Sequence, residues 1–210
     1  MNYAEEKAYW YLRLNGFFVI PDFVLHNKHG DTDLLGIRLS HTSEFVEGQR
    51  LKEDIELVNL FNESGCNIYR NTACVIAEVK GGRSIIKAKE IHEKFDLETL
   101  KYALNRFGLF RTSESNNIAE ELQKVKWVKM ENNNSIHKVL FVNKEAFTPS
   151  PDDRFSTLTN EHITEFIENR MRLGFKISDW SHFDSNFVQE TIYRVSKEKT
   201  KNKQEESNAE

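Results

Sequence analysis

Residues 74–82 have the sequence CVIAEVKGG, an apolar run that acquires a carboxylate at Glu78 and an amine at Lys80. In an extended strand the side chains alternate between faces, so Glu78 and Lys80 project the same way and Val79 projects the opposite way. Burying such a pair beside apolar residues costs on the order of several kcal/mol unless a bound metal ion or a phosphate compensates. The stretch therefore predicts a strand that ends in a charged functional site.

A second strand carries another carboxylate into an apolar setting, because residues 31–37 read DTDLLGI. We expect a strand from about Asp31 to Leu39, on which Asp31 and Asp33 share a face, so that either could serve the site. Asp33 lies deeper in the apolar strand, whereas Asp31 fits a turn after Gly30. Two acid-bearing strands, one also presenting a lysine, indicate a metal-dependent phosphodiesterase centre.

The N-terminal segment predicts a helix over residues 4–15 that ends at Gly16, a good C-terminal cap. Its apolar stripe has three-to-four spacing and consists of Ala4, Ala8, Tyr11 and Leu12. Glu5 falls on this inward stripe, while Glu6 falls on the side of Tyr9 and Trp10. If one glutamate of this helix faces the sheet, Glu5 is therefore favoured over Glu6.

These residues carry a resemblance to a known family. Asp33 followed by Glu78-Val79-Lys80, with a glutamate on the preceding helix, resembles the PD-(D/E)xK nuclease superfamily, which is also called restriction-endonuclease-like. Within it, residues 4–105 are most similar in layout to Holliday junction resolvases and Mrr-like nucleases. The resemblance implies a mixed central sheet of four or five strands flanked by helices.

The resemblance also implies a cofactor and roles for the site residues. It implies Mg²⁺, for which Mn²⁺ substitutes, held by Asp33, Glu78, the carbonyl of Val79 and Glu5. Lys80 would orient the nucleophilic water and offset charge on the pentacoordinate transition state. The expected activity is endonucleolytic hydrolysis of phosphodiester bonds in DNA, in anti-phage defence, restriction or repair.

Two alternatives stay open at this point. The chain could be a nuclease-like subunit that binds nucleic acid or scaffolds a larger complex without cutting. It could also be a ribonuclease of the same fold, since the sequence does not separate DNA from RNA. Cutting both strands would call for a homodimer or a partner protein subunit.

Composition sets broad limits on these readings. The net charge of −4 does not indicate general affinity for nucleic acids, but Glu78 to Arg111 holds eight basic against five acidic residues. This local excess could follow a phosphate backbone or form a solvated helical face. The two cysteines form no metal-ligand pattern. We expect a cytoplasmic location with no membrane association, because neither a signal peptide nor an apolar run of membrane-spanning length is visible.

The chain divides into an α/β nuclease-like domain, residues 1–147, an α-helical C-terminal extension, residues 148–195, and a disordered charged tail, residues 196–210. The first contains an insertion, residues 40–73, between the two acid-bearing strands. Residues 44–63 carry six acids against two bases, which would repel DNA and favours a packing, partner or lid role. Further expected elements are strands over residues 17–20 and 138–143, a turn at Pro21-Asp22, a hairpin loop at 27–30, and helices over residues 51–61, 97–107, 120–128, 159–173 and 185–195.

Overall fold

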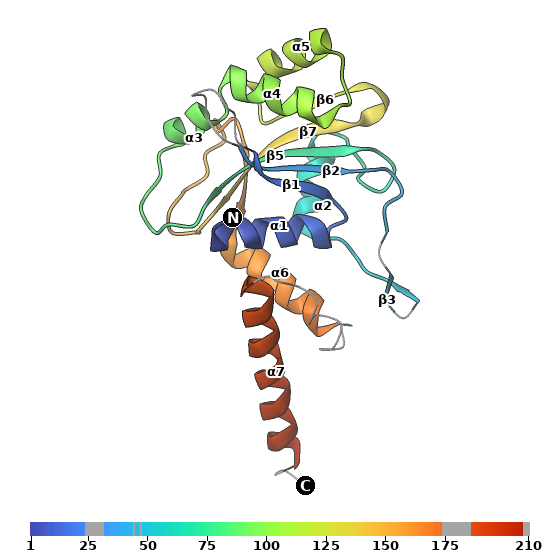
Figure 1. Cartoon of the computed structure of the whole chain (residues 1–210), viewed down its shortest axis with the longest axis vertical. Helices are drawn as coiled ribbons and strands as arrows, with labels where there is room; N and C mark the ends of the chain where they lie inside the picture. Colours follow the sequence, from blue (N-terminus) through green and yellow to red (C-terminus); the bar gives the residue numbers. More distant parts are fainter. Residues whose placement is uncertain (24–31, 44, 47, 174–185, 208–210) are drawn as a thin grey trace.

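The chain forms an α/β fold around a six-stranded mixed sheet (Figure 1). The computed structural model describes residues 1–23, 32–43, 45–46, 48–173 and 186–207. The strands run in the order β1–β2–β5–β7–β6, with β8 also paired to β7. Their bounds are β1 Phe18–Phe23, β2 Thr32–Arg38, β5 Ala73–Lys80, β6 Trp127–Lys129, β7 Ser135–Val142 and β8 Ser156–Thr159.

β5 has an antiparallel neighbour on one side and a parallel neighbour on the other. β2 pairs antiparallel with both β1 and β5, whereas β5, β7 and β8 run parallel to one another. β6 pairs antiparallel with the first half of β7, and β8 pairs with its second half. The carboxyl ends of β5, β7 and β8 consequently lie at one edge of the sheet.

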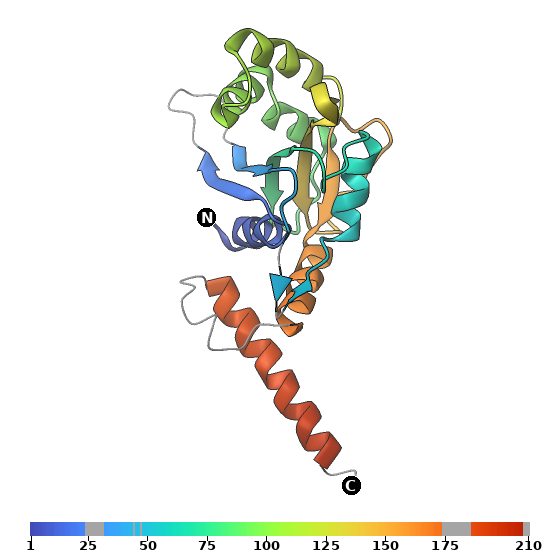
Figure 2. The same cartoon turned by 90° about the vertical axis from the view of Figure 1, so that its right-hand side faces the viewer.

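Helices cover both faces of this sheet and make two separate apolar cores (Figures 1 and 2). On one face lie α1 (Tyr3–Leu14), α2 (Ile55–Glu63) and α6 (Asn160–Arg172). On the other lie α3 (Ala88–Lys94), α4 (Leu97–Phe107) and α5 (Thr112–Leu122). Because the sheet is covered on both faces, the residues of β5 and β7 are buried nearly throughout instead of alternating between buried and exposed.

Alternation along β5 decides which layer each side chain meets. Val75 and Ala77 pack in the core beneath α1, whereas Cys74 and Ile76 pack in the core beneath α4. Glu78 continues the second series, so its side chain projects to the face that α3 and α4 cover.

The caps of α1 explain its bounds. Asn2 and Glu5 form a reciprocal capping box, in which the Asn2 side chain accepts from the Glu5 amide and the Glu5 carboxylate accepts from the Asn2 amide. At the other end, Gly16 has a φ of 81°, in the left-handed region that glycine adopts without strain. The expected N-terminal helix and its buried stripe are confirmed.

The insertion at 40–73 contains the short hairpin β3 (Phe45–Val46) and β4 (Gln49–Arg50), and then α2. α2 begins at Ile55, after the N-cap Asp54, and not at Leu51. The helical spacing of Leu51, Ile55, Val58 and Phe61 predicts that these residues share one apolar face. In the structure Ile55 is exposed, while Leu57 and Leu60 are buried. Because Leu51 lies before the N-cap and outside the helix, the inward stripe consists of Leu57, Leu60 and Phe61 at three-to-four spacing.

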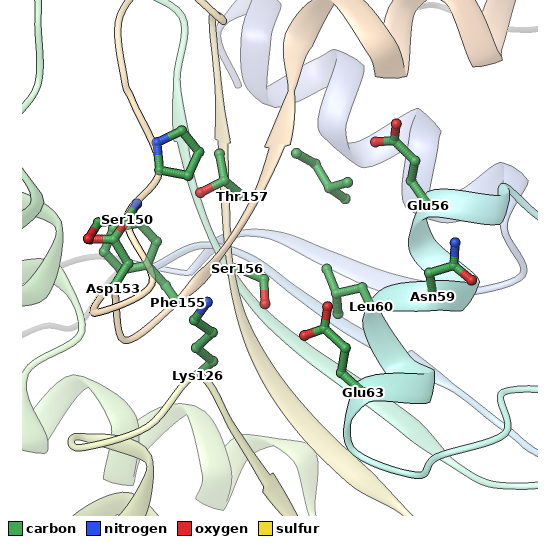
Figure 3. A pocket seen from close by; sticks show the side chains of 12 residues that line it. Glu56, Asn59, Leu60, Glu63, Lys126, Ser150, Asp153, Phe155, Ser156 and Thr157 are labelled. Carbon is green, nitrogen blue, oxygen red and sulfur yellow. The ribbon is translucent and has the colours of Figure 1, made fainter.

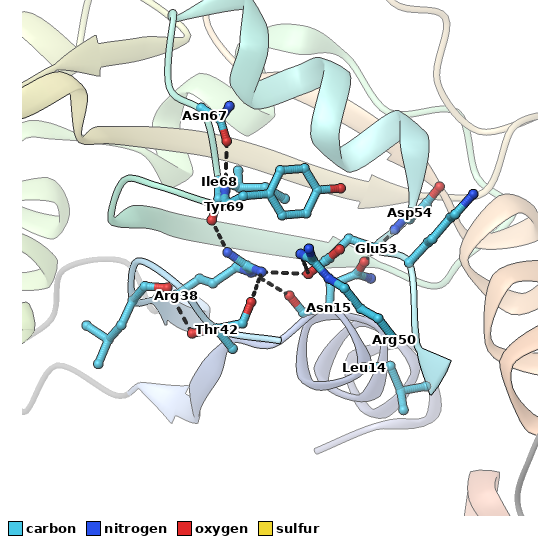
Figure 4. A network of polar contacts seen from close by, with 12 residues as sticks. Leu14, Asn15, Arg38, Thr42, Arg50, Glu53, Asp54, Asn67, Ile68 and Tyr69 are labelled. Carbon is cyan, nitrogen blue, oxygen red and sulfur yellow. Dashed lines mark hydrogen bonds and ion pairs between the residues drawn. The ribbon is translucent and has the colours of Figure 1, made fainter. Parts of the chain in front are cut away.

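Arg38, at the end of β2, attaches the insertion to the sheet (Figure 4). Its guanidinium is fully buried and donates hydrogen bonds to four acceptors, the carbonyls of Asn15, Thr42 and Ile68 and the carboxylate of Glu53. Since the guanidinium has five N–H donors in a planar fork, one side chain can join the end of α1 to both ends of the insertion.

Three further expected elements differ in the structure. β1 continues through Pro21, where a turn was expected; Pro21 is tolerated because β1 is an edge strand with β2 as its partner. The helix expected at 120–128 is wrong: α5 ends at Leu122, and the residues at 127–129 form β6. The segment expected to be only helical, 148–195, also contributes β8 to the sheet.

The last helix, α7 (Asn186–Ser207), continues into the range expected to be a disordered tail. Its Lys, Glu and Gln residues have good intrinsic helix propensity, which the charge count alone does not register. Figures 1 and 2 show α7 extending away from the sheet. In the part of the chain that the structure describes, no helix combines the length and the apolar character needed to cross a membrane. The expected hairpin loop at 27–30 lies outside the described residues.

Candidate functional site

Asp33 and Glu78 come together where β2 meets the end of β5. The ladder between these strands pairs Leu34 with Ala77, which places Asp33 opposite Glu78 at the next position. Side chains at directly opposed positions of an antiparallel pair project to the same face, a few ångströms apart. Asp33 is fixed there by its own hydrogen bond, because its Oδ2 accepts from the Val79 amide at 2.6 Å.

Lys80 completes this group from two residues further along β5. Its ammonium forms an ion pair with the Glu78 carboxylate, as two side chains on the same face of a strand can. The Glu78 side chain is 2% exposed and the Lys80 side chain is 33% exposed. The pair therefore presents a buried acid and a solvent-accessible amine at the same strand end.

The two carboxylates are electrostatically unfavourable for each other. Burial, followed by the negative charge of Asp33, raises the pKa of Glu78 to about 7, while Lys80 acts in the opposite direction. Burial likewise raises the pKa of Asp33, against the lowering effect of the Val79 amide and of Lys80. Two nearby carboxylates that resist ionisation form a site that a bound cation would stabilise.

Lys94 is a candidate site residue that the sequence did not single out. It lies in the last turn of α3 and is half-buried. Its positive charge lowers the pKa of both Asp33 and Glu78, so its amine lies within electrostatic reach of the pair. No sequence motif includes Lys94. The only sequence feature that pointed to this region was the excess of basic residues between Glu78 and Arg111.

Glu5 approaches this site from the opposite face of the sheet. α1 packs on the core that contains Val75 and Ala77, whereas Glu78 projects to the other face. Glu5 lies close enough to contribute to the raised pKa of Asp33, and its carboxylate is engaged by Asn2. Its role at the site stays a prediction.

The other candidates are distributed as follows. The Glu6 carboxylate accepts a hydrogen bond from the Phe187 amide at 3.4 Å, at the start of α7. Val79 is 4% exposed, with its side chain in the core beneath α1, and metal ligation by its carbonyl stays a prediction. Asp31 lies outside the described residues.

The donor set at this strand end fits a divalent cation such as Mg²⁺. Mg²⁺ prefers oxygen ligands and is commonly held by one or two carboxylates while it keeps several waters. Asp33 and Glu78 provide two such carboxylates at neighbouring positions. Within the described residues, no group of three or more histidine, cysteine, aspartate or glutamate side chains is placed to hold a metal ion.

A separate polar cavity of about 280 Å³ lies between α2 and the segment 149–158 (Figure 3). Its charged lining residues are Glu56, Glu63, Lys126 and Asp153. Asp33, Glu78 and Lys80 are not among the residues that line it. The cavity and the acidic pair are therefore distinct features of the molecule.

Comparison of the chain with protein-family models, with curated proteins and with solved structures finds no match. The proposed function therefore rests on the arrangement of Asp33, Glu78 and Lys80 at the strand ends.

Proposed function

We propose that the chain is a metal-dependent endonuclease of the restriction-endonuclease-like class that hydrolyses phosphodiester bonds in DNA. The single observation that carries the proposal is the placement of Asp33 opposite Glu78, with Lys80 contacting Glu78. These residues come from two strands more than forty positions apart. A structural salt bridge at the end of a strand would need only Glu78 and Lys80. The nearby, partly desolvated carboxylate of Asp33 is not needed for such a salt bridge and therefore favours a functional site.

Asp33 and Glu78 would hold Mg²⁺, or Mn²⁺ in its place, with the carbonyl of Val79 as a further ligand. A divalent cation bound there polarises the phosphate and stabilises the leaving oxygen. Lys80, with its amine partly open to solvent, is suited to orient the attacking water and to offset negative charge as it develops on phosphorus. Lys94 adds a second positive charge near the same carboxylates.

The direct test is cleavage of supercoiled plasmid by the purified chain with Mg²⁺, with Mn²⁺ and with a chelator. We expect nicking or linearisation that requires the divalent ion and falls at least 100-fold in Asp33→Asn, Glu78→Gln and Lys80→Ala. Lys89→Ala is a matched control, since the Lys89 side chain is 86% exposed and pairs only at 3.8 Å with Glu93. Loss of cutting in this control would show that cleavage depends on the overall positive charge of the protein and not on the candidate site.

The same experiment separates the alternatives. A single-stranded RNA and a single-stranded DNA substrate, tested in parallel, distinguish a ribonuclease from a deoxyribonuclease. If wild type and Lys80→Ala both bind DNA in a mobility-shift assay and neither cuts with any divalent ion, the enzyme proposal is wrong. The chain would then be a nucleic-acid-binding or scaffold subunit. A role in defence, restriction or repair is proposed from the family resemblance alone.

A further inference from the structure

Two asparagines lie immediately beyond the strands that flank the candidate site. Asn143 is the first residue after β7, and Asn160 is the first residue after β8. Both strands run parallel to β5, so both asparagines lie at the sheet edge where Lys80 ends β5. The topology thus brings residues from three separate parts of the chain to one strand end.

Their side-chain amides bind the main chain directly after the charged pair. The Asn160 Nδ2 donates to the Lys80 carbonyl at 3.1 Å and to the Asn143 Oδ1 at 2.7 Å. The Asn143 Nδ2 donates to the carbonyls of Gly81 and Gly82 at 2.9 and 3.0 Å. We call Asn143 and Asn160 the asparagine clamp, because together they engage three consecutive carbonyls.

The clamped segment is one that would otherwise be weakly fixed. Gly81 and Gly82 have no side chains to restrict their backbone, and both residues are exposed. The position of the Lys80 amine depends on the backbone at Lys80, where the strand ends. Each hydrogen bond to such a carbonyl contributes about 1 kcal/mol, so the clamp can define a segment that the glycines leave free.

The clamp residue Asn160 is itself firmly held. It is 3% exposed and is the first residue of α6, whose N-cap Thr159 accepts from the His162 amide at 3.3 Å. His162 Nε2 lies 2.6 Å from Asp54 Oδ2, which also accepts from the Tyr11 hydroxyl at 2.5 Å. The start of α6 is therefore connected to both α1 and α2.

The hydrogen-bonding balance of Asn160 shows which part of the amide matters. Its Oδ1 is buried and accepts no hydrogen bond from the described residues, which costs free energy. Its Nδ2 group donates the hydrogen bonds to the Lys80 carbonyl and to the Asn143 Oδ1. The donor function is accordingly what an asparagine provides at this position.

We propose that Asn143 and Asn160 are positioning residues that fix the end of β5 and thereby the orientation of Lys80 toward the two carboxylates. This inference rests on the proposed nuclease function. It makes the segment from β8 through α6 a part of the candidate site and not a separable appendage.

The kinetic test compares Asn160→Ala, Asn143→Ala and the double variant with wild type. We expect kcat to fall 10- to 100-fold with KM changed less than threefold, because a small misplacement of a catalytic group affects the chemical step. The double variant should lose little more than the worse single variant, since the two residues act as one unit. Asn105→Ala, at an exposed position of α4, is the matched control and should cut like wild type.

Asn160→Asp separates positioning from helix stability. An aspartate at the first position of α6 favours the helix through its dipole but removes both N–H donors. We expect a lower melting temperature, because the buried carboxylate would face the Lys80 carbonyl and the Asn143 Oδ1 without a donor. At an assay temperature where Asn160→Asp is still folded, we expect the activity loss of Asn160→Ala. If instead each Asn160 variant keeps wild-type activity at temperatures where it is folded, the proposal is wrong.

A readout without catalysis keeps the inference distinguishable from the function on which it rests. Lysine amines can be labelled by reductive ¹³C-methylation, and the Lys80 signal identified by its absence in Lys80→Ala. We expect the Lys80 resonance to shift in Asn160→Ala and Asn143→Ala, but not in Asn105→Ala. An unchanged resonance in both clamp variants overturns the clamp, whereas a wild type that cuts no nucleic acid overturns only the nuclease proposal.

Discussion

Asp33 stands opposite Glu78 across two antiparallel strands, and its Oδ2 accepts the amide of Val79 at 2.6 Å. This hydrogen bond holds the Asp33 carboxylate against the backbone of Val79, the residue that follows Glu78. Because the contact is made through the main chain of β5, the spacing of the two acids depends on the strand register and not on side-chain flexibility. This relationship leads directly to a dependence of stability on pH.

Glu78 should make the metal-free protein less stable as the pH rises. Its pKa is raised from 4.5 to about 7 in the folded chain, first by burial and then by Asp33. The folded state therefore holds a proton that the unfolded state releases, so stability is complete below pH 4.5 and is lost as the pH rises toward 7. The loss should be on the order of 2 kcal/mol.

Glu78→Gln should flatten this dependence, because glutamine does not titrate. The measurement is the melting temperature in chelator between pH 4.5 and 8, with the exposed Glu93→Gln as control. Mg²⁺ should raise the wild-type melting temperature at pH 8 and have little effect on Glu78→Gln. Equal pH slopes in wild type and Glu78→Gln would contradict the assignment.

Lys138→Met should stabilise the protein near neutral pH. Lys138 is 1% exposed on β7, and burial, followed by the charge of Arg154, lowers its pKa to about 7. The unfolded chain binds a proton that the folded chain does not retain, so stability rises with pH between about 7 and 10.5. Removing the amine should add on the order of 3 kcal/mol at pH 7.

The gain from Lys138→Met should shrink as the pH rises toward 10.5, because the amine then begins to lose its proton in the unfolded state as well. Urea denaturation at pH 7 and pH 9.5 measures the difference. Lys89→Met, at a side chain that is 86% exposed, controls for the general change in charge. A loss of stability at pH 7 would show that Lys138 has a stabilising anionic partner in the folded protein.

Gly81→Ala should impair both folding and the candidate site, whereas Gly82→Ala should be tolerated. A Cβ at Gly81 would lie 2.6 Å from the Ala4 Cβ, so α1 and the end of β5 would have to move apart. A Cβ at Gly82 would meet only the Ser84 nitrogen, at 4.0 Å. Overpacking of this kind costs about 1–3 kcal/mol.

Thermal melting and plasmid cleavage of the two glycine variants test this difference. We expect at least a tenfold loss of cleavage for Gly81→Ala and less than a threefold change for Gly82→Ala. Equal effects would mean that the close approach of α1 to β5 does not constrain the site.

Arg38→Met should be among the most destabilising single substitutions in the chain. It would leave the acceptors that Arg38 binds, including the buried Glu53 carboxylate, without their donor. Removing one partner of a buried ion pair costs about 3–5 kcal/mol. Arg50→Met is the matched control, because Arg50 is 46% exposed and lies 3.9 Å from the same carboxylate.

The control should lose less than about 1 kcal/mol, as exposed ion pairs do. Both variants can be compared by urea denaturation at pH 7. A cost for Arg38→Met similar to that for Arg50→Met would show that the insertion is held mainly by its apolar contacts.

The sequence predicted those elements whose signals are local. α4 has the expected bounds, because Asp96 caps its start and Gly108, with a φ of 67°, ends it. The charged end of β5 was visible because an acid and a lysine interrupt an apolar run. Its partner Asp33 was found for the same reason, as a carboxylate inside an apolar strand.

Other elements depend on contacts that are distant in the sequence. β8 has only four residues and is a strand because it pairs with β7, which no local pattern encodes. Lys94 and the asparagine clamp carry no motif, since their positions follow from the order of strands in the sheet. The prediction that Ile55 lies on the apolar face of α2 is wrong, because it includes Leu51, which precedes the N-cap Asp54 and is not part of the helix.

The late position of β8 has a consequence for how the polypeptide matures. Until residues 156–159 leave the ribosome, the second half of β7 has no neighbour on that side and presents open hydrogen-bonding groups. A nascent chain that ended near residue 147 would retain this bare edge permanently and would be prone to aggregate. Translation must therefore proceed well beyond the acidic pair before the sheet that supports it can close.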